Sequence, residues 1–345
     1  MSNFKYEGRL MELTKLQKEI VDAPYDKVVV LSAAASGKTT ILTEKVRQLL
    51  KANINPREIV VITFTNNAAA LLKERLGSDY KDGLFIGTIH SLANQMLIRA
   101  GIKTNKLIED EEFKEFFPLI KKNPTCIWSI DWLLLDEAQD SDPDQFEFMF
   151  DMINPPRFFV VGDYRQSIYQ WNGARPQLLL ALSRRKDIKT YSMNENHRNG
   201  YNILEYAKTL LRRGGMSDDS IALRSGGKVD MCSYLSSNIL KYIGMYGSYG
   251  DWAILSYTNT DVKKTLKLLK DVGIPCMTFK QADLNKSQLQ DAMKSNTVKV
   301  LTVHSAKGLE WPYVMNYKVN CFNEDKYCLK YVAATRARDL LVLLQ

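Results

Sequence analysis

The feature that most constrains this chain is an apolar run that leads into a loop of small residues and then into a helical pattern. Residues 28–31 read VVVL, residues 32–39 read SAAASGKT, and apolar side chains follow at helical spacing. A strand–loop–helix unit of this kind can surround phosphates with backbone N–H groups at the helix start. Lys38 can reach the terminal phosphates and the Thr39 hydroxyl can hold Mg²⁺. We therefore expect a nucleotide to contact Ser36, Gly37, Lys38, Thr39 and Thr40.

A second apolar run ends in two acidic residues. Residues 132–135 read WLLL and residues 136–140 read DEAQD, so Asp136 and Glu137 are expected at the carboxyl end of a strand. There Asp136 can bind the metal and Glu137 can polarise an attacking water molecule. Either pattern alone can arise by chance, but the two in this order predict a site that hydrolyses a nucleoside triphosphate.

The phosphate loop departs from the usual pattern. Ser32 stands where the pattern begins with glycine, and alanines fill positions 33–35. Glycines in such loops let the backbone turn and approach the ligand, whereas alanine resists positive φ. A loop that has lost nucleotide binding is therefore an alternative, which the intact partner residues disfavour.

Length and composition indicate a globular protein of two domains. The chain has 345 residues, 45% of them hydrophobic and 25% charged. It contains no stretch as long as a membrane span and no signal-peptide core near the N-terminus, so we expect a cytoplasmic protein without a membrane partner. Five scattered cysteines without a CxxC pair favour reduced thiols. The net charge of +8 favours a polyanionic partner.

Strand-like and helix-like runs alternate, which predicts an α/β fold with parallel sheets. The expected strands are 27–31, 59–64, 84–87, 132–135, 157–161, 188–192, 228–234, 252–256, 298–303 and 339–344. The expected helices are 38–51, 67–76, 89–100, 143–152, 200–213 and 261–272. We expect a first domain over 1–187, with a small helical insertion at 101–131, and a second over 188–345, with a loop at 214–227.

Five further blocks carry unusual residue choices. They read ITFTNNAA at 62–69, GTIHSL at 87–92, VVGDYRQSIYQWNGA at 160–174, LTVHSAKGLE at 301–310 and YVAATRA at 331–337. Together with the two nucleotide patterns, and in this order, these blocks resemble the UvrD/Rep family of superfamily 1 DNA helicases. The resemblance extends from Gln17 to the last predicted strand.

The resemblance implies two tandem RecA-like domains of the P-loop NTPase fold, with ATP between them and Mg²⁺ as cofactor. By position, Gln17 matches a residue that reads adenine, and its amide can donate and accept as an adenine edge requires. Gln166 matches a residue that senses the γ-phosphate, and Arg198 and Arg336 match two arginines directed at the phosphates. His197 and Glu310 lie in blocks that also contact the nucleotide.

The resemblance also implies contacts with DNA. Phe64 and Trp171 match aromatic residues on which bases stack, an interaction that tolerates every base. Contacts with the DNA backbone, or coupling roles, are implied for Thr65, Asn66, His90, Thr302 and His304. The histidines lack metal-ligand spacing, so we expect no metal site built on them.

Several positions depart from the family. His197 replaces a tyrosine that packs on adenine and Thr40 replaces an arginine, so preference for ATP should be weaker. Asn67 and Asn172 replace basic residues near the expected DNA track, which should lower affinity for single strands. The segments 91–135 and 199–303 are too short for the large accessory domains that the family inserts there.

These observations predict an ATP- and Mg²⁺-dependent helicase or translocase on single-stranded DNA, moving 3′ to 5′. We expect a monomer that meets duplex junctions and works with a loading, replication or repair partner. One alternative is a translocase with little unwinding of its own. A second is a DNA-binding module whose ATP site has decayed.

Overall fold

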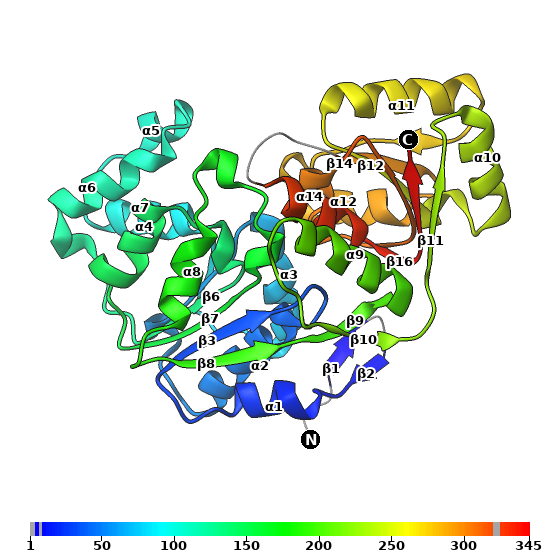
Figure 1. Ribbon diagram of the computed structural model, residues 1–345. Coiled ribbons are helices and arrows are strands. Elements are labelled where there is room, and N and C mark those ends of the chain that lie inside the picture. Colours follow the sequence, from blue (N-terminus) through cyan, green and yellow to red (C-terminus); the bar gives the residue numbers. More distant parts are fainter. Residues whose placement is uncertain (1–3, 7–8, 320–324) are drawn as a thin grey trace. The chain divides into compact units, whose positions relative to one another are not determined.

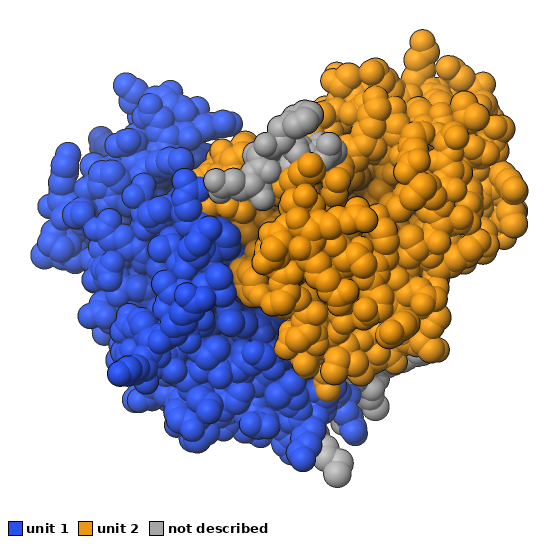
Figure 2. Space-filling model, in the orientation of Figure 1, with its two compact units in different colours: residues 1–32, 37–162, 175–193 blue, residues 33–36, 163–174, 194–345 orange. Residues whose placement is uncertain are grey.

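The computed structural model describes residues 4–6, 9–319 and 325–345, so Cys321 lies outside the described residues. The chain divides into two compact units, which Figure 2 shows in different colours. Unit 1 comprises residues 1–32, 37–162 and 175–193, and unit 2 comprises residues 33–36, 163–174 and 194–345. Each unit is built around one parallel sheet (Figure 1).

Unit 1 contains a sheet of six parallel strands in the order β5-β4-β6-β7-β3-β8. The strands are β3 (Lys27–Ser32), β4 (Ile59–Ile62), β5 (Phe85–Gly87), β6 (Trp132–Leu135), β7 (Arg157–Gly162) and β8 (Lys189–Met193). A separate antiparallel pair, β1 (Phe4–Tyr6) and β2 (Arg9–Met11), precedes them. Because the six strands are parallel, the phosphate loop after β3 and Asp136 after β6 lie at the same edge of the sheet.

Helices cover both faces of this sheet, which explains why its central strands β4 and β6 are apolar throughout. Alternate strand residues pack against α1 (Lys15–Val21), α2 (Lys38–Lys51) and α3 (Asn66–Leu76) on one face. The others pack against α4 (Ile89–Arg99), α6 (Phe116–Lys122) and α8 (Pro176–Ser183). The short helix α5 (Asn105–Glu109) precedes α6, and α7 (Pro143–Glu147) continues as a π-helical turn at Phe148–Met152.

Unit 2 contains a second sheet of six parallel strands in the order β11-β16-β15-β12-β14-β13. The strands are β11 (Lys228–Cys232), β12 (Trp252–Ser256), β13 (Cys276–Met277), β14 (Val298–Thr302), β15 (Trp311–Tyr317) and β16 (Ala337–Leu344). A two-stranded parallel ribbon, β9 (Glu195–Gly200) and β10 (Ile221–Arg224), accompanies the sheet. Arg198, one of the two arginines expected at the phosphates, lies on β9.

The second sheet is also covered on both faces. One face packs against α9 (Tyr201–Arg213), α13 (Val303–Ala306) and α14 (Lys326–Ala334). The other packs against α10 (Ser236–Met245) and α11 (Asn259–Asp271), and α12 (Lys286–Lys294) follows β13. No helix among the described residues has both the length and the apolar character needed to cross a bilayer.

The α/β class with parallel sheets is confirmed, and every predicted strand overlaps an observed one. One expectation about elements was wrong, because the predicted loop at 214–227 contains the strand β10. No prediction was made for the short or irregular strands β1, β2, β9 and β13, or for β15, which lies inside the second sheet. The predicted helical insertion at 101–131 corresponds to α5, α6 and short 3₁₀ turns.

Candidate nucleotide and nucleic-acid site

The phosphate loop leads directly into α2, whose first residue is Lys38. Gly37 caps this helix with φ of 92°, a left-handed conformation that glycine adopts without strain. A Cβ atom added at Gly37 would lie 2.6 Å from Nε2 of Gln17, so the close approach of this side chain also requires glycine. The helix start therefore has the local geometry that a phosphate-binding site needs.

Gln17 lies against this loop rather than on an open helix surface. It is buried, and its Oε1 accepts a hydrogen bond of 3.0 Å from the backbone N–H of Thr14. Thr14 Oγ1 in turn accepts from the N–H of Gln17 at 3.3 Å, which completes a capping box at the start of α1. The same side chain thus caps α1 and contacts Gly37, while its role toward adenine stays a prediction.

Thr39 and Asp136 lie together in unit 1. The Thr39 hydroxyl donates to Oδ2 of Asp136 at 3.3 Å, and Oδ1 of Asp136 accepts from the N–H of Glu137 at 2.9 Å. Burial raises the pKa of Asp136 to about 7, with Glu137 adding to the rise, although Lys38 opposes it. A site short of positive charge, with a hydroxyl beside a carboxylate, fits a magnesium ion that takes its other ligands from phosphate and water.

The carboxylate of Glu137 is held by a neighbour that the sequence reading left unassigned. Nε2 of the buried Gln139 donates to Oε2 of Glu137 at 2.6 Å. Glu137 itself has φ of 51°, an uncommon conformation for a residue with a side chain. Strained backbone of this kind clusters at functional sites, and here it fixes the direction of the carboxylate that is expected to orient water.

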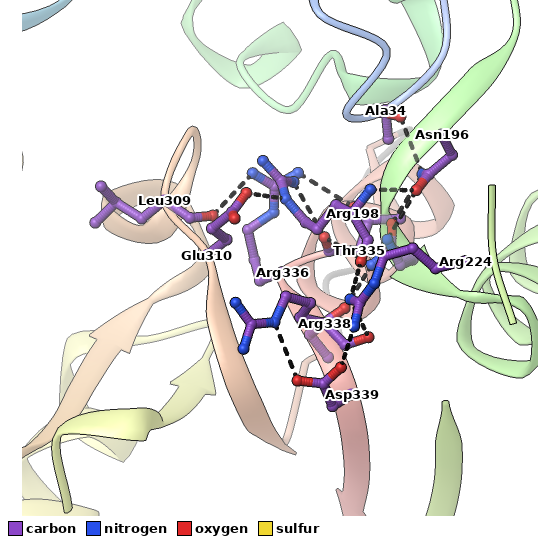
Figure 3. Close-up of polar contacts among 12 residues, drawn as sticks. Ala34, Asn196, Arg198, Arg224, Leu309, Glu310, Thr335, Arg336, Arg338 and Asp339 are labelled. Atoms are coloured by element: carbon purple, nitrogen blue, oxygen red, sulfur yellow. Dashed lines mark hydrogen bonds and ion pairs between the residues drawn. The ribbon is translucent and has the colours of Figure 1, made fainter. Parts of the chain in front are cut away.

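In unit 2, Arg336 is buried and donates hydrogen bonds from all three of its guanidinium nitrogens (Figure 3). Its Nη2 donates to Oε1 of Gln166 at 3.3 Å and to the Thr335 hydroxyl at 3.2 Å. Its Nε and Nη1 donate to the carbonyl oxygens of Val332, at 3.0 Å, and Leu309, at 3.2 Å. The structure therefore brings together two of the residues assigned to the phosphates, Gln166 and Arg336.

Arg198 and Arg336 share Thr335 as a hydrogen-bond partner. Arg198 Nε donates to the carboxylate of Glu310, and its Nη1 donates to the Thr335 carbonyl at 3.2 Å (Figure 3). Burial alone would raise the pKa of Glu310, but Arg198 and Arg336 outweigh it and hold this pKa below its ordinary value. Glu310, expected to contact the nucleotide, is thus the counter-ion of Arg198 in this structure.

The turn that carries Gln166 rests on a buried network of charges. Nε2 of Gln166 donates to Oδ2 of Asp163 at 2.7 Å, and Arg165 Nε donates to Oδ1 of the same carboxylate at 2.8 Å. Arg165 Nη1 also donates to Asp218 at 2.7 Å, and the Tyr331 hydroxyl donates to Asp218 at 2.9 Å. These contacts fix both ends of the Gln166 amide, because its oxygen faces Arg336 and its nitrogen faces Asp163.

Three aromatic rings of unit 2 gather around His304. The centroid of its ring lies 5.6 Å from Tyr169, 6.0 Å from Trp171 and 6.0 Å from Tyr257. His304 Nε2 is 3.1 Å from the Ile168 carbonyl, and burial lowers the pKa of His304, which favours the neutral ring. Trp171 is 63% exposed and so presents a free face for stacking. The sequence reading found Trp171 and His304 but missed Tyr257, which follows β12 in a block without a recognised pattern.

The remaining DNA candidates lie at helix starts. Thr65 caps α3 by accepting from the N–H of Ala68 at 3.1 Å, with the exposed Phe64 before it and Asn66 as the first helical residue. Thr302 caps α13 in the same way through Ser305. His90 packs on Phe113 and Phe117, with centroids 5.9 and 5.5 Å away, and burial lowers its pKa.

Three nucleotide candidates have modest contacts. Thr40 lies in the first turn of α2, where its N–H donates to the Gly37 carbonyl at 2.9 Å. Nε2 of His197, on β9, is 3.8 Å from Oε2 of Glu195, and burial lowers the pKa of His197. Ser36 donates its hydroxyl to the Ala33 carbonyl at 2.9 Å and so helps to close the loop.

Comparison with known families gives two matches along the chain. The UvrD/REP helicase N-terminal domain matches residues 13–128 and 126–187, which together make up more than half of the chain. The UvrD-like helicase C-terminal domain matches residues 297–344. The chain therefore belongs to the UvrD/Rep family of helicases.

Individual relatives agree with this assignment. The chain is 28% identical over 291 residues to the ATP-dependent DNA helicase Rep of Escherichia coli, covering 58% of this chain and 43% of Rep. It is 23% identical over 367 residues to DNA helicase II of Haemophilus influenzae, covering 76% of this chain and 50% of that protein. It is 30% identical over 226 residues to Gabija protein GajB of Bacillus cereus, covering 52% of this chain and 45% of GajB. The chain thus spans half or less of the length of these relatives.

Proposed function

We propose that this chain hydrolyses ATP and couples the hydrolysis to movement along single-stranded DNA. The observation that carries the proposal is the pairing of Thr39 with Asp136 beside Lys38, next to a Glu137 carboxylate held by Gln139. That arrangement supplies a phosphate-binding cation, a metal-binding carboxylate and an oriented base for water. Family membership and the names of the Rep and DNA helicase II relatives support the same activity.

Each residue has a distinct part in this proposal. Lys38 and the loop N–H groups bind the phosphates, and Glu137 orients the attacking water. Mg²⁺, held by Thr39 and Asp136, would neutralise charge on the phosphate oxygens. Arg198, Arg336 and Gln166 are the residues proposed to act on the phosphates and to make DNA binding sensitive to hydrolysis.

The DNA side of the proposal rests on exposed aromatic residues and on the excess of basic side chains. We propose that Phe64 and Trp171 stack on bases, and that His304 and Thr302 link this surface to the nucleotide residues. The 3′-to-5′ direction, action as a cytoplasmic monomer and contact with duplex junctions belong to the same proposal.

The deciding experiment measures ATP hydrolysis with and without single-stranded DNA. Strong stimulation is expected for the unaltered chain and almost none for Lys38→Ala. Lys51→Ala is the matched control, because Lys51 is the exposed last residue of the same helix. Glu137→Gln should retain nucleotide binding without turnover. Absence of hydrolysis in the unaltered chain, with single-strand binding intact, would instead support the DNA-binding module.

A translocase with little unwinding is the second candidate. It is favoured by the small size of the segment between α4 and β6, which holds only α5, α6 and short turns. An unwinding assay on a tailed duplex, without other proteins, distinguishes the two. Strand separation at a rate comparable to that of hydrolysis would exclude this candidate.

A further inference from the structure

The β9 segment holds two carbonyl groups of the phosphate loop. Nδ2 of Asn196 donates to the Ala34 carbonyl at 3.0 Å, a contact drawn in Figure 3, and the N–H of His197 donates to the Ala35 carbonyl at 3.1 Å. All of these residues belong to unit 2. We propose that Asn196 is a positioning residue that lets a loop of alanines bind phosphate. This inference rests on the proposed function.

Peptide geometry explains how a bond to a carbonyl prepares a phosphate site. In a planar trans peptide, the carbonyl of one residue and the N–H of the next point in opposite directions. Holding the carbonyls of Ala34 and Ala35 toward β9 therefore directs the N–H groups of Ala35 and Ser36 to the other side. Anion binding by such loops depends on N–H groups that converge away from the carbonyls.

Ala35 is the position at which this support is needed. Its φ is 54°, in the left-handed region that a side chain disfavours and glycine accepts freely. Without the bonds from β9, rotation to negative φ would relieve the strain and turn the neighbouring peptides out of place. The two hydrogen bonds thus do for Ala35 what the absence of a side chain does for glycine.

The same asparagine also fixes the backbone of Arg198. Its Oδ1 accepts from the N–H groups of Arg198, at 3.0 Å, and Asn199, at 2.8 Å. Its Nδ2 also donates to Oδ1 of Asn199 at 2.9 Å, and Asn199 donates to the Thr335 carbonyl at 3.2 Å. Asn196 is fully buried and its amide can satisfy these partners in one orientation only. One side chain therefore sets both the loop peptides and an arginine directed at the phosphates.

Asn196→Asp separates these two functions. The variant keeps an acceptor for Arg198 and Asn199 but loses the donor to the Ala34 carbonyl. We expect the affinity for ATP to fall about tenfold or more. This affinity is measured by titration in the presence of Mg²⁺, under conditions in which ATP is not hydrolysed. Ala35→Gly should bind at least as tightly as the unaltered chain, and the double variant should recover to within about threefold of it.

The rescue by glycine distinguishes positioning from a general role in folding, because a folding defect at β9 would persist when Ala35→Gly is added. Asn196→Ala provides an uncharged second variant, in which adding Ala35→Gly should recover part of the lost affinity, because the acceptor for Arg198 and Asn199 is lost as well. Asn202→Asp is the control, because Asn202 is exposed at the start of α9 in the same unit. Thermal unfolding of each variant is measured alongside.

Two results would overturn the inference: an equal loss of affinity with and without Ala35→Gly, or unchanged affinity in Asn196→Asp. If the unaltered chain binds no ATP, the proposed function itself fails. If it binds ATP and the rescue is missing, only the role of Asn196 fails.

Discussion

Asp136 is a carboxylate that the surrounding protein does not neutralise. Burial and the neighbouring Glu137 raise its pKa to about 7, against about 4 in an unfolded chain. Above the unfolded value the unfolded state releases the proton first, so ionisation penalises the folded state progressively between about pH 4 and pH 7. The penalty is fully present above pH 7, in the absence of a bound cation.

Asp136→Asn should therefore stabilise the metal-free protein, and more so at pH 8 than at pH 5. The asparagine retains an acceptor for the N–H of Glu137 and carries no charge to bury. Thermal unfolding in EDTA at the two pH values measures the difference. A gain that is equal at both values, or larger at pH 5, would show that ionisation of Asp136 is not its cause.

At the scale of single residues, the sequence assigned Thr39 and Asp136 to one magnesium ion. The structure joins their side chains by a hydrogen bond, and the metal role stays a prediction. Gln139 and Asn196 were not assigned, since their roles depend on hydrogen bonds that no local pattern encodes. The sequence indicated only that alanines in this loop resist positive φ, and it did not place that conformation at Ala35.

Among the elements, the turn that carries Gln166 depends most on charges that lie far away in sequence. Arg165 bridges Asp163 and Asp218, and Tyr331 on α14 donates to Asp218. Asp163 and Asp218 outweigh the burial of Arg165, so the pKa of Arg165 is raised and its charge persists. This network fastens the turn to the segment before β10 and to α14.

Asp218→Asn should destabilise unit 2 by about 2–3 kcal/mol, because it leaves a buried guanidinium with one carboxylate fewer. Urea unfolding measures the change. The control is Asp219→Asn, since the Asp219 side chain is 72% exposed and its Oδ1 is 3.7 Å from Nη1 of Arg165. Its loss should lower the free energy of unfolding by less than about 1 kcal/mol. Equal losses of stability in the two variants would show that the buried contact of Asp218 contributes no more to stability than the exposed contact of Asp219.

Two strands that were not predicted, β15 and β10, have features that explain why. Pro312 falls within β15, and proline is unusual inside a sheet because it lacks the N–H that pairs with a neighbour. The register of β15 against β16 shifts between Trp311 and Tyr313, which accommodates the proline. The strand β10 is short, and its pairing with β9 across a long sequence separation leaves no trace in local periodicity.

For the whole molecule, Trp171 is the best test of DNA coupling. Trp171→Ala should raise the dissociation constant for a single-stranded oligonucleotide by about 5- to 150-fold, which corresponds to about 1–3 kcal/mol of stacking. Stimulation of hydrolysis by DNA should fall, while hydrolysis without DNA stays unchanged. Tyr201→Ala is the control, since Tyr201 is also exposed in unit 2 and lies outside the His304 cluster. An unchanged stimulation ratio in Trp171→Ala would remove the stacking role.

The general architecture was accessible from the sequence, because alternating apolar runs and helices predict parallel sheets. The division of the chain was less accessible. By their contacts, residues 33–36 and 163–174 belong with unit 2, although both segments come before the proposed domain boundary. Such membership depends on packing between distant segments, and the proposed boundary between 187 and 188 stays a prediction.

The pairing of Arg198 with Glu310 has a thermodynamic consequence. Any anion that binds Arg198 through the same guanidinium nitrogen must first displace a carboxylate from within the protein. Binding at Arg198 is an exchange of one negative partner for another. The net free energy of binding is therefore the difference between the interaction of Arg198 with the anion and its interaction with Glu310. In the proposed cycle, Glu310 replaces the departing phosphate as the counter-ion of Arg198, which favours release of the product.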